Sequence, residues 1–350
     1  MRPIGSLLLG PIGDLIGRRS MMISSMVVMG SCSLLIGFLP TDTGWGAWAA
    51  YALLALRMLQ GLSVGGEYTG SLTFVFETAR PEQRGWQGAV ASSGAIVGFV
   101  AGAAAAALVY GLLPKTAVLA WGWRMPFLAG ALIALLGLWL RSSVLPADKA
   151  PADNGGPIQL LRAILKERAA MLQVMAAIAF ADVAYYLVLV VEPQNAIRQM
   201  PALASRFSLI TAINEAVGIG LVLLGGLLAD RLGVRRCMQT CCLALAAMIL
   251  PADLLMQQAT TVSLAIGQLM AVVPLMLILG AYPALLPGLF PISQRCTSFS
   301  LAYSLVVAVL GGTAPLLATW MVAKQGWSLG PALYTLLWLP GCLWALGRCR

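Results

Sequence analysis

Histidine is absent from this sequence of 350 residues, and charged side chains make up only 10% of it. The chain therefore lacks the commonest metal ligand and the side chain that titrates most readily near neutral pH. Any proton that it handles is expected to be carried by a carboxylate. A GxxxxGK[ST] loop, which binds nucleotide phosphates, is also missing from the sequence, so no motif in it indicates a reaction driven by ATP, and no enzyme activity is predicted.

Cysteine is present, but without the spacing that would give it a structural role. The seven cysteines do not form the paired pattern of a zinc site or a disulfide framework, and they fall inside apolar segments or near their ends. Free thiols are therefore expected, and neither a metal nor a cofactor is predicted. The positions are Cys32, Cys237, Cys241, Cys242, Cys296, Cys342 and Cys349.

Long apolar runs fill most of the chain. Hydrophobic residues make up 60% of the sequence, and the mean hydropathy is +0.87. A water-soluble protein with an unusually apolar core is the alternative, but its composition would be far less apolar. Because a helix needs about 20 residues to cross a bilayer, the runs predict one partial span and ten full ones. The partial span is 3–16, and the full spans are 21–40, 47–77, 85–113, 121–141, 169–191, 206–229, 236–253, 261–284, 297–323 and 329–347.

Lysine and arginine are distributed unequally between the two sides of the predicted spans. If the loop holding Arg18 and Arg19 lies in the cytoplasm, fifteen of these residues fall inside and only five fall outside, which fits the positive-inside rule. The net charge of +9 is then a signal of topology and needs no nucleic-acid partner. The sequence thus predicts a multi-pass protein of a bilayer with a cytoplasmic C-terminus.

One long hydrophilic interval, residues 142–170, divides the chain into two halves. Its first part is rich in proline and glycine, and its second part predicts a short amphipathic helix with one apolar side and one basic side. A plain linker helix and a regulatory helix on an anionic leaflet both fit this pattern. We therefore expect an N-terminal helical bundle over 1–141, a cytoplasmic linker over 142–168 and a C-terminal six-helix bundle over 169–350. The side-chain pattern rests on Ile158, Leu161, Leu165, Arg162, Lys166 and Arg168.

The two halves repeat one motif at the cytoplasmic end of a predicted span. The first copy is GPIGDLIGRR and the second is GLLADRLGVRR, with aspartates at 14 and 230, which are 216 residues apart. Glycine lets a helix end turn tightly and approach a neighbour, while aspartate and arginine form ion pairs that can break and reform. The repeated positions are Gly10, Asp14, Gly17, Arg18 and Arg19, and then Gly226, Asp230, Arg231, Gly233, Arg235 and Arg236.

This repeat resembles the loop signature of the major facilitator superfamily. Further segments resemble its metabolite:proton symporter branch, namely RMLQGLSVGGEYTGSLTFVFETARPEQRG, WGWRMPF and SLAYSLVVAVLGGTAPLLATW. The resemblance implies an all-α transporter of the bacterial inner membrane, in which two helical bundles alternate around a central site. Measured against that branch, Met1 resembles a residue inside helix two, so helix one and the outer half of helix two are expected to be missing. Such a chain is expected to insert but not to couple transport.

Two positions depart from the family pattern. Leu15 stands where a basic residue usually follows the motif aspartate, and Gly288 stands where a glutamate usually precedes Phe-Pro. The first half keeps the corresponding acid, Glu77, close to Arg84. We therefore expect a charge-paired cytoplasmic gate that is intact in the N-terminal half and weakened in the C-terminal half.

Ionisable residues inside predicted spans are candidates for solute and proton binding, since each costs at least about 2.5–3.5 kcal/mol at the bilayer centre. Arg57, Gln60 and Glu67 lie on one span. At 100° per residue, Gln60 and Glu67 are about 20° from a common line and Arg57 is within about 80° of Glu67. All three can therefore face one cavity, although a structural network between helices is the alternative.

The C-terminal half offers a second polar set. Asp182, Tyr185 and Tyr186 fall on one face of the span at 169–191, and Asn214 and Glu215 enter the next span. Tyrosines beside an acid suit a small polar solute, although tyrosine near an interface is also ordinary. Two further acids, Glu192 and Asp253, sit at outer span ends and are expected to be solvated.

The predicted function is proton-coupled symport of a small polar metabolite by a monomer, with the solute, protons and the bilayer as its partners. An organic acid is favoured, because Arg57 and Arg206 offer positive charge. A zwitterionic osmolyte such as proline or betaine is the alternative, and a truncated remnant that no longer transports is another.

Overall fold

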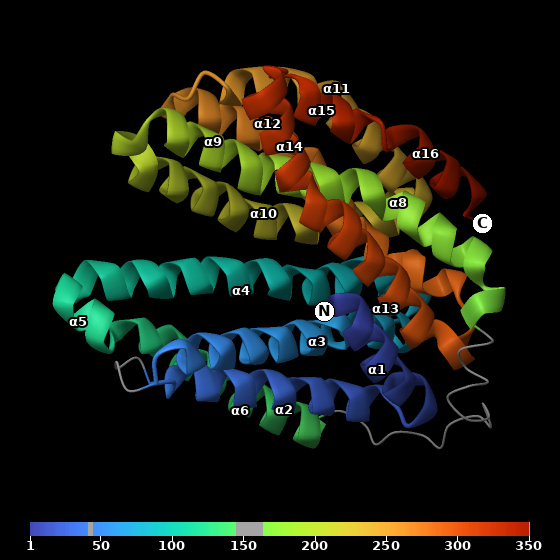
Figure 1. Cartoon of the computed structure of the whole chain (residues 1–350). Coiled ribbons are helices and arrows are strands. Elements are labelled where there is room, and N and C mark those ends of the chain that lie inside the picture. Colours follow the sequence, from blue (N-terminus) through green and yellow to red (C-terminus); the bar gives the residue numbers. More distant parts are fainter. Residues whose placement is uncertain (41–44, 145–163, 350) are drawn as a thin grey trace. The chain divides into compact units, whose positions relative to one another are not determined.

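The computed structural model describes residues 1–40, 45–144 and 164–349, and every regular element within them is helical (Figure 1). The prediction of an all-α fold is confirmed. The helices are α1 (Arg2–Leu15), α2 (Arg18–Gly37), α3 (Ala47–Thr78), α4 (Arg84–Leu112), α5 (Lys115–Ala120), α6 (Met125–Val144), α8 (Arg168–Tyr186), α9 (Glu192–Gln199), α10 (Ala204–Leu232), α11 (Val234–Met256), α12 (Thr261–Ala281), α13 (Arg295–Val306), α14 (Gly312–Gln325), α15 (Gly330–Leu336) and α16 (Leu339–Arg348).

Nine helical stretches in the described residues are long and apolar enough to cross a membrane. They correspond to nine of the ten predicted full spans, with ends that shift by several residues. The stretches are Arg18–Gly37, Ala47–Thr78, Pro81–Leu112, Gly122–Ser143, Arg168–Gln199, Pro201–Leu232, Val234–Met256, Thr261–Ala284 and Ile292–Val322.

The tenth predicted span, 329–347, is broken in the structure. It forms α15 and α16, which are separated by Leu337 and Trp338. Pro340 explains the break, because proline has no N–H to donate to the carbonyl four residues earlier and its ring clashes with that carbonyl. The predicted span over 329–347 is thus formed by two shorter helices.

Two of the long stretches contain a π-helical turn. One turn, η3, spans Leu187–Val191 between α8 and α9, and the other, η8, spans Val307–Gly311 between α13 and α14. Because hydrogen bonds in such a turn reach one residue further than in an α-helix, local carbonyls lose their usual partners. Turns of this kind occur frequently at functional sites.

The chain divides into two compact units, each with residues from both sequence halves. In unit 1, α2 packs along α6, and Met21, Met22 and Cys296 form a buried cluster. In unit 2, α10 and α11 each pack along α12. Unit 1 comprises Met1–Phe74, Ala101–Glu167 and Pro291–Ser304, and unit 2 comprises Val75–Val100, Arg168–Phe290 and Leu305–Arg350.

The predicted bundles over 1–141 and 169–350 and the predicted linker over 142–168 stay predictions. Residues 145–163, which hold most of that linker and of its predicted amphipathic helix, lie outside the described residues. Large apolar side chains are exposed on the long helices, for example Leu132 at 68% and Leu316 at 71%. Exposed apolar surface of this kind fits lipid better than water.

Candidate functional site

Asp14, the first motif aspartate, caps the start of α13. Its buried carboxylate accepts hydrogen bonds from the backbone N–H of Cys296 at 3.1 Å, the backbone N–H of Thr297 at 2.8 Å and the Thr297 hydroxyl at 2.6 Å. It also pairs with Arg18 at 2.5 Å. The first N–H groups of a helix have no partner within it, and the helix dipole favours negative charge there. Asp14 therefore joins α1 to the first turn of α13.

Asp230, the second motif aspartate, makes the equivalent contact in unit 2. Its carboxylate accepts the backbone N–H of Gly85 at 2.7 Å and that of Trp86 at 2.8 Å. These residues are the second and third of α4, just as Cys296 and Thr297 are the second and third of α13. Each aspartate thus caps, in the same register, a helix from the other half of the sequence.

The basic and glycine positions of the motif lie around these caps. Gly17 and Gly233 have φ of 146° and 87°, which allows the chain to turn between α1 and α2 and between α10 and α11. Arg18 also donates to the Ile292 carbonyl at 3.1 Å, and Arg19 donates to the Ser142 carbonyl. In the second copy, Arg235 donates to the Cys349 carbonyl at 3.2 Å, while Arg231 and Arg236 are exposed.

Two glycines allow the backbones to approach closely where Asp14 caps α13 and where Asp230 caps α4. A Cβ atom at Gly226 would lie 2.4 Å from the Gly85 carbonyl oxygen, and one at Gly10 would lie 2.7 Å from Thr297 Cα. Neither neighbour is the flexible end of a side chain. Only glycine fits these two positions without moving the helices apart.

We predict that Gly226→Ala and Gly10→Ala each lower the transport rate by about tenfold, since helix separation lengthens charge-assisted hydrogen bonds worth about 1.5–3 kcal/mol. Gly220→Ala is the matched control, because it also lies on α10 but a Cβ there meets no atom within 4 Å. Initial rates in proteoliposomes measure the effect. Equal rates for Gly226→Ala and Gly220→Ala would show that close packing at the cap is unimportant.

The space at Gly288, where the family pattern has an acid, is taken by an aromatic ring. A Cβ at Gly288 would lie 2.6 Å from the Phe76 ring, and the Arg84 guanidinium lies over that ring at 4.3 Å from its centroid. Arg84 thus stacks on Phe76. Phe76 directly precedes Glu77, the acid that was predicted to lie close to Arg84. The predicted asymmetry of the gate stays a prediction.

The three predicted residues of α3 fall into two groups. Arg57 donates to Gln60 Oε1 at 3.1 Å and lies over the Phe127 ring at 4.9 Å, while Gln60 donates to Ser33 Oγ at 3.0 Å. Ten residues further along, at a rise of about 1.5 Å per residue, Glu67 is about 15 Å away.

Glu67 has a different partner. It pairs with Arg141 of α6 at 3.1 Å, and Arg141 also donates to the Met22 carbonyl at 3.1 Å. The structure therefore brings Arg57 and Gln60 together and places Glu67 in a separate ion pair. Sequence reasoning used Arg141 only as a topology signal and missed this contact.

Asp182 and Tyr186 meet at the π-helical turn η8. A Cβ at Gly311 would lie 2.4 Å from Tyr186 Cε2 and 2.7 Å from Asp182 Oδ2. Tyr185 and Tyr186 are in edge-to-face contact, with ring centroids 5.9 Å apart. Asp182 and Tyr186 of the predicted set thus lie against a glycine of the other π-containing stretch, and Tyr185 contacts the Tyr186 ring.

Asn214 belongs to a buried amide network that includes a residue missed from sequence. Asn214 Nδ2 donates to Gln268 Oε1 at 3.0 Å, and Gln268 Nε2 donates to Thr211 Oγ1 and to the Val188 carbonyl, each at 3.1 Å. Val188 lies in η3, so Gln268 satisfies a carbonyl of the π-helical turn. Glu215, the next residue on α10, is half-buried.

The prediction that Glu192 and Asp253 are solvated was wrong. Their exposed fractions are 3% and 0%. Each carboxylate accepts one side-chain amide: Asn195 donates to Glu192 at 3.4 Å, and Gln257 donates to Asp253 at 2.9 Å. Position near a helix end suggested solvent, but neighbouring elements cover both side chains.

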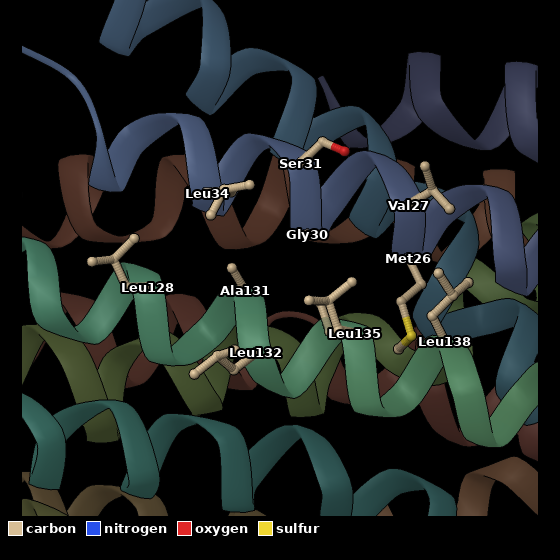
Figure 2. Close-up of a pocket in the computed structure, with 11 residues that line it drawn as sticks. Met26, Val27, Gly30, Ser31, Leu34, Leu128, Ala131, Leu132, Leu135 and Leu138 are labelled. Carbon is tan, nitrogen blue, oxygen red and sulfur yellow. The ribbon is translucent and has the colours of Figure 1, made fainter.

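An apolar pocket of about 330 Å³ lies between α2 and α6 in unit 1. Figure 2 shows Leu34, Leu128, Ala131 and Leu135 lining it, with Ser31 as a polar exception. Because so few polar groups converge there, this pocket does not suit a small polar solute.

Comparison with known proteins decides the family. Residues 3–213 match the family model of the Major Facilitator Superfamily. The chain belongs to the Major Facilitator Superfamily. The resemblance of the repeated motif is thereby confirmed, and this superfamily member is a multi-pass membrane protein.

Several relatives match almost the whole chain. It is 31% identical to the ectoine/proline transporter ProP of Corynebacterium glutamicum, over 95% of this chain and 70% of that protein. It is 32% identical to a putative proline/betaine transporter of Staphylococcus aureus, over 95% of this chain and 73% of that protein. The proline/betaine transporter of Escherichia coli is 30% identical, over 96% and 70%.

Solved structures of the superfamily share the fold. The proton:xylose symporter XylE aligns with a TM-score of 0.82 at 17% identity, over 100% of this chain and 84% of that chain. The fucose:proton symporter FucP of E. coli aligns with a TM-score of 0.67 at 14% identity, over 97% and 87%. At these identities the likeness concerns the fold alone.

Proposed function

We propose that this member of the Major Facilitator Superfamily is a proton-coupled symporter of a zwitterionic osmolyte of the proline and betaine type. The observation that carries the proposal is the identity of 30–32% to relatives named for ectoine, proline or betaine, over at least 95% of the chain. These solutes carry one positive and one negative charge. A zwitterion therefore replaces the organic acid as the favoured solute.

The charge balance of the polar residues supports a zwitterion. The organic acid hypothesis relied on Arg57 and Arg206, but the Arg57 guanidinium already engages Gln60 and Phe127, and Arg206 is exposed. Asp182 beside Tyr186 supplies a negative group for a cationic nitrogen. Asp182 is thus the residue proposed to face the ammonium group of the solute.

Proton coupling is assigned to carboxylates, since the chain has no histidine. Glu67 is the favoured coupling acid, because it is partly exposed and its partner Arg141 can release it when the helices move. The aspartate caps at α13 and α4 form the gate, which opens when Asp14 and Asp230 leave the helix starts. We propose that this gate lies on the cytoplasmic side of a bacterial inner membrane and that the transporter works as a monomer.

The proposal predicts uptake of L-proline or glycine betaine into proteoliposomes that hold the 350-residue chain. With the membrane voltage clamped at zero and the outside one pH unit more acidic, one proton per solute can drive up to about tenfold accumulation, since one unit is about 1.4 kcal/mol. Radiolabelled solute measures it, and a protonophore is the control.

Each alternative gives its own result in the same assay. Accumulation of succinate or citrate without accumulation of proline or betaine would restore the organic acid hypothesis. Uptake of none of the four would support a chain that does not transport.

A further inference from the structure

A polar cavity of about 310 Å³ lies in unit 2, and neither Asp182 nor Asp230 lines it. It forms where α9 meets the C-terminal ends of α11 and α14 and the loop after α14. Its volume is at the lower limit of ligand pockets, which suits a small solute. The polar side chains that line it are Glu192, Asn195, Arg198, Gln199, Gln257, Thr319 and Ser328.

Two carboxyl groups lie at the buried side of this cavity. Glu192 lines it with 3% of its surface exposed, and Asp253, which is fully buried, interacts with Glu192 electrostatically. Gln257 links Asp253 to the wall, because it donates to both Asp253 Oδ2 and the Ser328 carbonyl at 2.9 Å. Buried carboxylates are costly unless a positive group or several donors compensate them.

These two carboxyl groups have few hydrogen-bond donors. Glu192 and Asp253 each receive one neutral amide, and Asp253 Oδ1 has no hydrogen-bond partner within the described residues. The positive group that lines the cavity is Arg198, which is exposed at its outer side. The cavity therefore has carboxyl groups at its base and a guanidinium group at its rim.

We propose that this cavity is a second binding site for a zwitterionic solute, with the solute's cationic nitrogen facing Glu192 and its carboxylate facing Arg198. The inference rests on the proposed function and adds a site to it. From the turn at Gly233 to Gln257, α11 extends roughly 35 Å at about 1.5 Å per residue. A solute in this cavity thus lies at the opposite end of α11 from Asp230, and it can bind there before it is transported.

Equilibrium binding of radiolabelled L-proline to the purified 350-residue chain tests the site. The wild type is expected to bind two molecules per chain. Glu192→Gln removes the buried carboxyl group while keeping the volume, and Arg198→Gln removes the positive charge at the rim. Each variant should retain one molecule, with affinity at the lost site at least tenfold weaker.

Gln194→Ala is the matched control, since Gln194 is exposed on α9 and is not part of the cavity wall. It should bind two molecules. A thermal melt of each variant detects loss of folding. Replacing sodium by potassium in the buffer is a second control, because a melting temperature that depends on sodium identifies an inorganic cation as the occupant.

The outcomes separate the inference from the proposed function. One molecule per chain, unchanged by Glu192→Gln and Arg198→Gln, overturns the second site and leaves the proposed function standing. No binding of L-proline or betaine by the wild type overturns both. Stabilisation by sodium alone, with one L-proline site unaffected, also overturns the inference.

Discussion

Asp14→Asn and Asp230→Asn are each expected to slow solute exchange by about 10- to 100-fold while changing solute affinity by less than about threefold. The asparagine amide keeps the volume, but it carries no charge and turns an NH₂ group toward backbone N–H donors. Charge-assisted hydrogen bonds contribute about 1.5–3 kcal/mol, and 1.4 kcal/mol is a factor of ten in a population. The conformer that contains the caps should therefore become about 10- to 100-fold rarer.

Exchange of labelled for unlabelled solute across proteoliposomes, together with equilibrium binding, measures the two quantities separately. Glu82→Gln is the matched control, because Glu82 is an exposed acid in the turn that precedes α4. A large fall in affinity at unchanged exchange rate would place the aspartates at the solute site instead of at the gate. A much greater effect for one aspartate than for the other would reveal the asymmetry predicted from Leu15 and Gly288.

Glu67→Gln is expected to abolish accumulation driven by a proton gradient, so that internal solute only equals external solute. Glutamine can still accept a hydrogen bond from Arg141, whose nitrogen lies 3.1 Å from Glu67 in the ion pair, but it cannot carry a proton. Exchange without a gradient should continue within about threefold of the wild-type rate, because Glu67 is proposed to carry the proton and not to bind the solute.

Glu67→Asp is the control that keeps an acid at this position, and it should restore part of the accumulation. Proteoliposomes with the outside more acidic give the measurement. If Glu67→Gln accumulates solute as the wild type does, the ion pair with Arg141 is structural. The coupling acid would then be sought at Asp182 or Glu215.

The sequence predicted the elements well because each depends on residues close together in the chain. Apolar runs and charge clusters placed nine long helices, and the repeat identified Asp14 and Asp230. Pro340, which separates α15 from α16, is a local signal of the same kind. The π-helical turns have no distinct composition, so η3 and η8 could not be predicted.

The contacts of the site were much harder to predict, because their partners are distant or chemically inconspicuous. Asp14 binds backbone amides 282 and 283 residues away. Since almost every residue has a backbone N–H, the sequence does not indicate which of them will be the donor. Gln268 is uncharged, so a search for ionisable residues passed over it. The burial of Asp253 depends on how helices pack, which hydropathy along one helix does not describe.

The capping contacts constrain the sequence unequally at their two partners, the aspartate and the helix start. The acceptor must be a carboxylate at positions 14 and 230. The donors are main-chain N–H groups, which nearly every amino acid possesses. Substitutions at Trp86 and Cys296 can therefore change the side chain and leave the donor intact. Proline is the exception, because it alone has no N–H. In a natural variant, the arrival of proline at the second or third residue of α4 or α13 would mark the loss of this contact, even where both aspartates remain.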